Sequence, residues 1–252
     1  MKKLIVFASL IFVGFQAQGQ VRFGLKGGMN MSSVDVSTKE EMSFDIDISY
    51  RFAFHVGGFV EIPVSGLFSV QPELLFSSKG MRFKTPEIYF PSITGFGSVP
   101  ETKEIYTPCY IELPVYLKAG FKVGAGKFIV GVGPYIVYGV CGKYKTEMKW
   151  TRNPDETIAT GKGEMAVFKR DYLKLKVTSD YPPFGAEDEI VFDKAHLKRF
   201  DFGFTGFAGY ELNCGFFVTA GFQKGLYNID NFDEKGDKMK NKTILLSVGY
   251  KF

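Results

Sequence analysis

Residues 109–118 read Cys-Tyr-Ile-Glu-Leu-Pro-Val-Tyr-Leu-Lys, and this stretch decides the fold class. Every second residue from Cys109 to Leu117 is apolar, whereas the positions between them include Glu112 and Lys118. A strict period of two predicts a β-strand with two chemically different faces, because an amphipathic helix would repeat at spacings of three and four.

The same alternation recurs along the chain, in segments bounded by Gly, Pro, Asn or charged clusters. The eight expected strands are Val21 to Met31, Tyr50 to Ile62, Leu67 to Phe83, Glu104 to Ala119, Phe128 to Glu147, Lys198 to Leu212, Gly215 to Asn228, and Thr243 to Phe252. Long connections (32–49, 84–103, 148–197 and 229–241) alternate with tight turns. We therefore expect an all-β fold, an eight-stranded antiparallel up-and-down transmembrane β-barrel with long extracellular loops.

The polar faces of these strands are rich in glycine and carry charges of both signs. The residues expected to form a lumen charge network are Arg22, Lys26, Glu73, Glu112, Asp201 and Glu211. An eight-stranded interior is only wide enough for side chains to fill it, so we expect a lumen without an open diffusion pore. Periodicity does not say which face is inside, so a soluble barrel of the lipocalin type is the alternative. Six tyrosines near segment ends are candidates for interfacial girdles, namely Tyr50, Tyr106, Tyr116, Tyr138, Tyr210 and Tyr250.

The N-terminus has the pattern of a secretory signal peptide. Lys2 and Lys3 precede an apolar run, and small residues follow at 17–19. We expect cleavage after residue 19 and a barrel domain over 20–252; a retained signal anchor is the alternative. Outside this run, no stretch of about 20 apolar residues predicts a spanning helix. The full chain has 31 basic and 27 acidic residues, a balance that indicates no nucleic-acid partner.

Candidate chemistry is sparse. The two histidines are His55, expected inside the barrel, and His196, which lies near Asp193 at the end of a connection. No nucleophile and base can be assembled around them, and neither cofactor nor metal ligands show the required spacing. Asp230, Asp233, Glu234 and Asp237 lack calcium-loop spacing. Cys109 and Cys141 are expected on opposite faces of the sheet, where they cannot bridge. We therefore expect no enzyme.

Several short motifs occur together in a specific order. They are Gly24-Leu25-Lys26-Gly27-Gly28, Gln71-Pro72-Glu73-Leu74-Leu75-Phe76, Ile111 to Lys118, Gly133-Pro134-Tyr135, Asp201-Phe202-Gly203, Gly225 to Ile229, and Leu246 to Phe252. In this order the chain resembles the PorT-like outer-membrane β-barrel domain, also called the small porin family. The resemblance implies a Gram-negative outer membrane; the family is functionally mixed, and one branch serves the type IX protein secretion system. The ending with Tyr250 and Phe252 resembles the signal that barrel-assembly machinery recognises.

The expected partners are outer-membrane lipid, the assembly machinery, and a protein bound through the loop 148–197, whose aromatic and charged residues suit either a folded cap or a protein contact. Binding tends to reside in loops on a rigid scaffold, so we expect a structural or binding scaffold. The alternatives are an accessory component of a type IX-like secretion system, a small-solute porin and a lipid-modifying barrel enzyme.

Overall fold

The computed structural model describes residues 21–37, 47–89, 98–153, 156–169, 172–179, 188–192, 196–231 and 238–252. The expected signal peptide, 1–19, lies outside them. The strands are β1 (Arg22–Ser37), β2 (Asp47–Pro63), β3 (Phe68–Ser78), β4 (Met81–Thr85), β5 (Ile88–Tyr89), β6 (Ser98–Val99), β7 (Glu101–Val123), β8 (Gly126–Asn153), β9 (Glu156–Ala166), β10 (Leu173–Ser179), β11 (Asp188–Phe192), β12 (Phe200–Leu212), β13 (Phe216–Gly225) and β14 (Lys238–Lys251). Among the described residues, no helix is long and apolar enough to cross a membrane.

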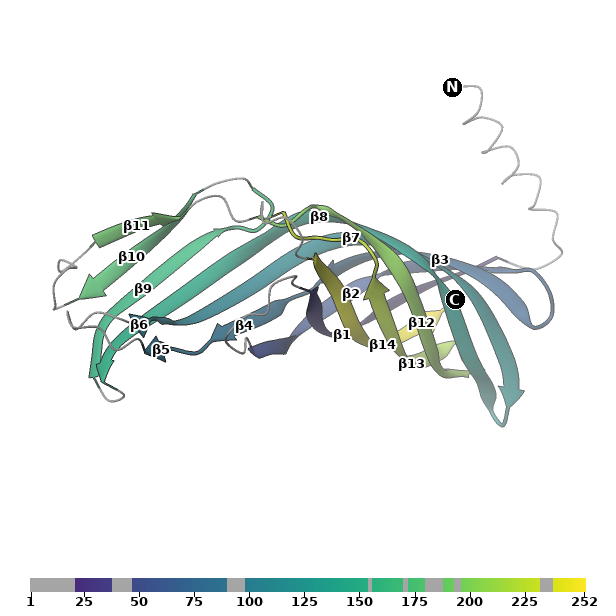
Figure 1. The fold of residues 1–252 in the computed structure, drawn as a ribbon. Helices are drawn as coiled ribbons and strands as arrows, with labels where there is room; N and C mark the ends of the chain where they lie inside the picture. Colours follow the sequence, from purple (N-terminus) through teal and green to yellow (C-terminus); the bar gives the residue numbers. More distant parts are fainter. Residues whose placement is uncertain are drawn as a thin grey trace, which may run out of the picture.

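Eight of these strands close into a ring (Figure 1). The antiparallel order is β1, β2, β3, β7, β8, β12, β13, β14 and back to β1. This confirms the predicted all-β barrel class. Short turns join β7 to β8 and β12 to β13, where Gly124 and Gly215 have φ of 57° and 91°. These positive φ values suit glycine, which has no Cβ to clash with the backbone.

The third predicted strand, Leu67 to Phe83, is interrupted. The structure divides it into β3 and β4 at Lys79 and Gly80, and both parts pair with β2 and β7. A Cβ on Gly80 would lie 2.9 Å from the Arg51 side chain, which would have to move to accept a larger residue. The Lys79 side chain keeps the inward phase of Glu73 and Ser77 and is 1% exposed.

The segment predicted as a loop over 148–197 contains more strand than expected. β8 continues to Asn153, and β9, β10 and β11 add to its upper part in sequence. We call residues 143–153 of β8 together with β9, β10 and β11 the side sheet; it projects from one end of the ring (Figure 1). Its inward face is apolar, with Leu173, Leu175 and Val177 buried. The long connection expected over 148–197 therefore contains folded strands in this part.

The segment between β8 and β12 leaves and rejoins the ring at neighbouring positions. The Gly139 N–H donates to the Arg199 carbonyl at 2.7 Å, and Arg199 Nη1 donates to the Gly139 carbonyl at 2.9 Å. The chain between them forms the side sheet and then returns to β12.

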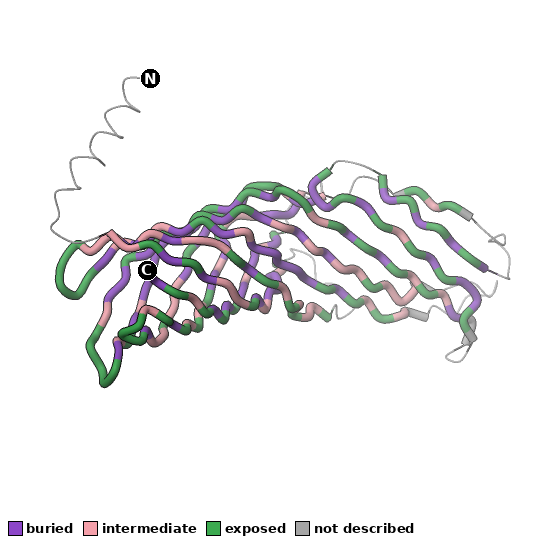
Figure 2. The backbone as a smooth tube through the Cα atoms, turned by 180° about the vertical axis from the view of Figure 1, so that it is seen from behind, coloured by how far each residue is buried: buried purple, intermediate pink, exposed green. Residues whose placement is uncertain are grey.

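Buried and exposed residues alternate along the ring strands (Figure 2). The outer surface is apolar and continuous from strand to strand; its exposed members include Leu25, Phe54, Leu74, Leu113, Val132, Phe204, Val218 and Leu246. Four of the six girdle candidates are partly or largely exposed, but Tyr106 and Tyr116 are buried in the interior, so their assignment to a girdle was wrong. Their even-numbered positions on β7 share the inward phase of Glu112.

A β-bulge in β8 changes the phase of that strand. Tyr110 pairs with Gly139 whereas Cys109 pairs with Cys141, so Val140 is the extra residue. Val140 and Cys141 are both exposed. Cys109 and Cys141 therefore face each other on the same outer side, and the prediction of opposite faces was wrong because strict alternation does not foresee an inserted residue.

Candidate functional site

The interior of the ring holds a series of charged clusters, one above another. The lowest is a four-membered ion-pair ring from four strands. Lys118 Nζ lies 2.6 Å from Glu61 and 3.2 Å from Glu211, and Lys251 bridges the same two glutamates. All four residues are buried. Since each cation contacts two carboxylates, the charges balance within the cluster.

The next cluster joins β1 to β3. Lys26 Nζ lies 2.6 Å from Glu73 Oε2, and Gln71 Nε2 donates to Glu73 Oε1 at 2.7 Å. The Lys26 ammonium also lies 5.7 Å from the centre of the Tyr116 ring, a cation–π contact. The pair therefore links β1 to β3 across β2, while Gln71 Oε1 has no hydrogen-bond partner among the described residues.

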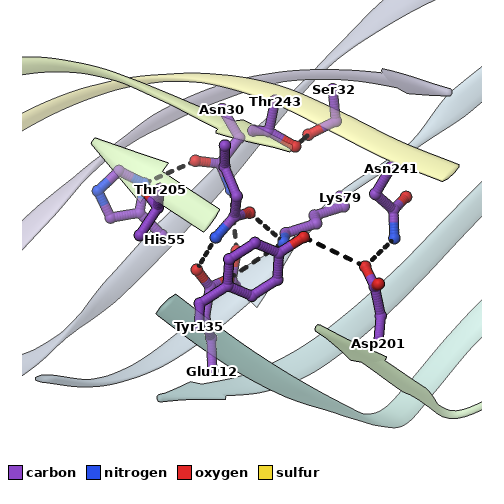
Figure 3. A network of polar contacts seen from close by, with 12 residues as sticks. Asn30, Ser32, His55, Lys79, Glu112, Tyr135, Asp201, Thr205, Asn241 and Thr243 are labelled. Carbon is purple, nitrogen blue, oxygen red and sulfur yellow. Dashed lines mark hydrogen bonds and ion pairs between the residues drawn. The ribbon is translucent and has the colours of Figure 1, made fainter. Parts of the chain in front are cut away.

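A third cluster is formed around Lys79, the residue at the break between β3 and β4 (Figure 3). Lys79 Nζ lies 3.3 Å from Glu112 Oε2 and donates to the side-chain oxygen Oε1 of Gln223, while Gln223 Nε2 donates to Glu112. The ammonium also lies 5.0 Å from the centre of the Tyr135 ring. Side chains from opposite sides of the ring thus meet on the barrel axis.

His55 lies in this interior, within a chain of hydrogen bonds. Its Nδ1 is 2.7 Å from Asn30 Oδ1 and its Nε2 is 2.9 Å from Ser247 Oγ. Asn30 Nδ2 donates onward to the Ser78 carbonyl at 2.8 Å. The sequence pattern did not connect these residues, and the structure places a serine, a histidine and an asparagine in one hydrogen-bonded chain.

Asp201 stands apart from these ion pairs. It is fully buried, accepts from Asn241 Nδ2 at 2.8 Å and from the Tyr135 hydroxyl at 3.4 Å (Figure 3). Its Oδ1 has no hydrogen-bond partner among the described residues. Neutral donors therefore hold this carboxylate.

Above the charged clusters, the interior becomes an apolar core. It contains Val34, Met81, Phe83, Tyr106, Tyr110, Tyr135, Val137, Tyr144, Met165, Val167, Phe168, Leu173, Leu197, Ile229 and Met239. Backbone hydrogen bonds from Val167 to Gly142, from Leu197 to Val167 and from Ile229 to Met239 hold its covering segments. Phe168 lies over Gly139, where a Cβ would come within 2.3 Å of the ring. The excursion between β8 and β12 thus closes one end of the barrel.

Inside the ring, a void of about 10 Å³ lies beside Lys26 and Glu73. Two recesses, of about 420 Å³ and about 200 Å³, open at the short-turn end next to the four-membered ring, and Arg22 lines both. Four of the six predicted network residues, Lys26, Glu73, Glu112 and Glu211, lie buried in the clusters. Asp201 is buried apart from them, and Arg22 lies at the mouth.

Sequence reasoning missed most of the partners. Glu61, Lys118, Gln223 and Lys251 occupy the same inward phase as the predicted charges, so the alternation itself could have identified them. Lys79 also shares the inward phase of Glu73 and Ser77, so the same alternation could have identified it.

The described residues form no metal site and no other arrangement of catalytic side chains. They contain no group of three or more potential metal ligands. His196 contacts Asn231, while Asp193, Asp233, Glu234 and Asp237 lie outside the described residues.

A closed antiparallel ring that is apolar outside and ion-paired within defines a transmembrane β-barrel, because only a closed barrel satisfies all strand hydrogen bonds in lipid. The chain belongs to the outer membrane protein beta-barrel domain family, whose model matches residues 16–231. It is thus an outer-membrane protein. The end of its last strand presents two outward aromatic rings, Tyr250 and Phe252, whose centres are 5.4 Å apart.

Solved outer-membrane barrels are similar to this chain at low identity. The outer membrane protein OprG from Pseudomonas aeruginosa shares 13% identity with a TM-score of 0.42, covering 94% of this chain and 98% of that one. Ail from Yersinia pestis, solved in complex with the heparin analogue sucrose octasulfate, shares 12% with a TM-score of 0.34 over 93% and 100%. The outer membrane protease OmpT from Escherichia coli shares 9% with a TM-score of 0.33 over 92% and 96%. No curated protein matches the sequence.

Proposed function

We propose that this protein is a sealed, non-conducting outer-membrane scaffold whose side sheet is its binding element. The observation that carries the proposal is the stack of ion pairs and aromatic side chains that crosses the lumen from the four-membered ring to the apolar core. A hydrated ion would have to displace buried, paired charges, each of which would be costly to leave unpaired.

Planar-bilayer recording of the purified protein tests the sealed lumen. We expect no steady conductance from the folded barrel, with a general diffusion porin as the positive control in the same lipid. A steady channel of large conductance would overturn the proposal in favour of a small-solute porin.

The alignment of Ser247, His55 and Asn30 is the specific observation that favours an enzyme. A serine nucleophile beside a histidine oriented by a third group is the geometry of acyl transfer. However, His55 is 1% and Ser247 5% exposed, so no ester can approach the hydroxyl. We infer a structural hydrogen-bond chain that fixes β1, β2 and β14 together.

Labelling with a fluorophosphonate ester separates these two interpretations. We expect no labelling of the folded protein at Ser247 and the same result for Ser247→Ala. Labelling of the wild type that Ser247→Ala abolishes would establish the enzyme.

The side sheet supports a binding role because it has its own buried apolar layer. Ala159, Leu175 and Val177 form a core that Met148, Trp150 and Ile190 flank, and such packing holds the exposed face in one shape. This rigidity suits recognition of a partner. Membership of a PorT-like secretion branch is tested by deleting the gene and comparing the secreted and surface proteins with those of the parent strain.

A further inference from the structure

The outward face of the upper barrel and side sheet is strongly basic. Among the residues whose exposure the structure describes, its nine exposed cations are Arg82, Lys84, Lys103, Lys143, Lys145, Lys149, Lys162, Lys174 and Lys176. The acids described on and beside this face are Asp47, Glu101, Glu147, Glu164 and Glu189. Nine positive charges less five negative charges leave an excess of four. We call this surface the basic face.

The strand register makes the basic face continuous. One cross-strand row runs through Lys84, Lys103, Glu147, Lys162, Lys176 and Glu189, on β4, β7, β8, β9, β10 and β11. In this row Lys84 stands directly opposite Lys103, and Lys162 directly opposite Lys176. Like charges placed directly opposite each other on neighbouring strands destabilise the sheet. An anion bound from outside would relieve the repulsion between these lysines.

The acids of the face neutralise it only locally. Glu164 accepts from Lys143 and Lys145, and these two hydrogen bonds hold its pKa below the usual value. Burial acts to raise the pKa of Glu101, but hydrogen bonds from Lys84 and Lys103 outweigh it and the pKa is lowered. The carboxylates of Glu101 and Glu164 are thus each shared between two lysines, and the excess positive charge of the face remains exposed.

The height of the basic face above the hydrocarbon identifies the anion. On β7 the outward apolar residues continue up to Cys109, which faces the exposed Cys141 beside Val140, and Lys103 lies six residues higher. At about 3.3 Å per residue and a tilt of about 40°, the cross-strand row of Lys103 lies about 15 Å above the apolar band. Phospholipid headgroups reach only about 5 to 8 Å beyond the hydrocarbon, so they fall short of this row.

We propose that the basic face binds the phosphorylated saccharide chains of outer-leaflet glycolipid, the lipid that surrounds the barrel directly below it. A saccharide carries its anionic groups to the height at which the lysines stand. Lateral access from the bilayer also explains why the face continues the lipid-facing surface of β7 and β8 without a step. This inference rests on the proposed role of the side sheet as a binding element.

The experiment uses the full mature protein in nanodiscs, with lipopolysaccharide bearing a phosphorylated core as the probe. The test variant is Lys103→Gln/Lys162→Gln/Lys176→Gln. The matched control, Lys122→Gln/Lys238→Gln/Lys240→Gln, removes three other lysines outside the basic face, so both variants lose the same net charge. At about 1 kcal/mol per lysine near an anionic surface, we expect about a hundredfold weaker binding for the test variant and wild-type affinity for the control.

Three outcomes would overturn the inference: equal affinity of wild type and test variant, equal affinity for enzymatically dephosphorylated lipopolysaccharide, or equal binding to phosphatidylglycerol nanodiscs without saccharide. Preference for a soluble polyanion such as heparin over lipopolysaccharide would also overturn it. Heat-modifiability on gels verifies that both variants are folded. Failure here would leave the sealed scaffold intact, because the conductance test does not depend on the basic face.

Discussion

The membrane ring and the upper barrel with its side sheet use the same alternation with opposite polarity. On β7, Leu113 and Val115 point outward and Glu112 inward, whereas a few residues higher Lys103 points outward and Tyr106 inward. The difference follows from the surroundings, since the outer face of the ring meets hydrocarbon and that of the extension meets water. The outer face of one strand can thus be apolar where it meets lipid and charged where it meets water.

The largest effect should come from breaking an ion pair inside the ring. Lys79→Met leaves the Glu112 carboxylate buried and unpaired, so we expect the free energy of unfolding to fall by about 3 to 5 kcal/mol. Urea unfolding followed by heat-modifiability in lipid vesicles measures this. The double variant Lys79→Met/Glu112→Leu should recover much of the loss, because it removes both charges.

A lysine-to-methionine substitution in the side sheet gives the corresponding cost for an exposed ion pair. Lys162 and Glu147 form an exposed pair at 3.7 Å, for which we expect Lys162→Met to cost about 0 to 1 kcal/mol. A loss as large as that of Lys79→Met would mean that the two regions do not differ in dielectric surroundings.

A lysine substituted on the outer face of each region tests directly whether the ring meets lipid and the side sheet meets water. Val115 and Val191 are exposed to similar extents, 42% on the ring and 53% on the side sheet. We expect Val115→Lys to destabilise the protein by about 2 to 4 kcal/mol, because it places a charge near the bilayer midplane. Val191→Lys should change stability by no more than about 0.5 kcal/mol. Equal costs at the two sites, measured by the same unfolding assay, would refute the assignment of the bilayer to the ring.

The smallest expected effect concerns Glu104 on the inward face of the upper barrel. Burial raises the pKa of this carboxyl, although the Tyr144 hydroxyl donates to it and opposes the rise. Because the folded pKa lies above the unfolded one, the stability that this group contributes is fully present below the ordinary glutamate pKa and is lost as the pH rises through the folded pKa.

Hydrogen exchange of residues 101–107 and 143–149 should therefore show more frequent opening at pH 8 than at pH 5, after correction for the intrinsic rate. Glu104→Gln should reduce this difference, since glutamine keeps the acceptor without the titration. The exposed acids Glu101 and Glu164 are present in both proteins and cancel in the comparison. An identical pH dependence in the variant would contradict the assignment.

Alternation alone predicted the ring, its closure order and most inward charges, because a one-residue slip would turn every side chain to the wrong face. It failed where the pleat is interrupted. The bulge at Val140 inserts a residue that no binary pattern shows, and it determines the facing cysteines. The side sheet escaped prediction for a different reason: its strands are short, and lysine and threonine alternate there with apolar residues in a segment whose length favoured a loop.

The hydrogen bonds between Gly139 and Arg199 show that the long segment between them is an insertion in the ring, which it leaves and rejoins at adjacent positions. Such insertions tolerate changes of length. Because Phe168 and Leu197 of this insertion cover the upper lumen, a version trimmed to a tight turn would retain the cylinder but lose its lid. The ion-paired clusters deeper in the ring would remain, so such a variant separates the contribution of the cover from that of the charged interior.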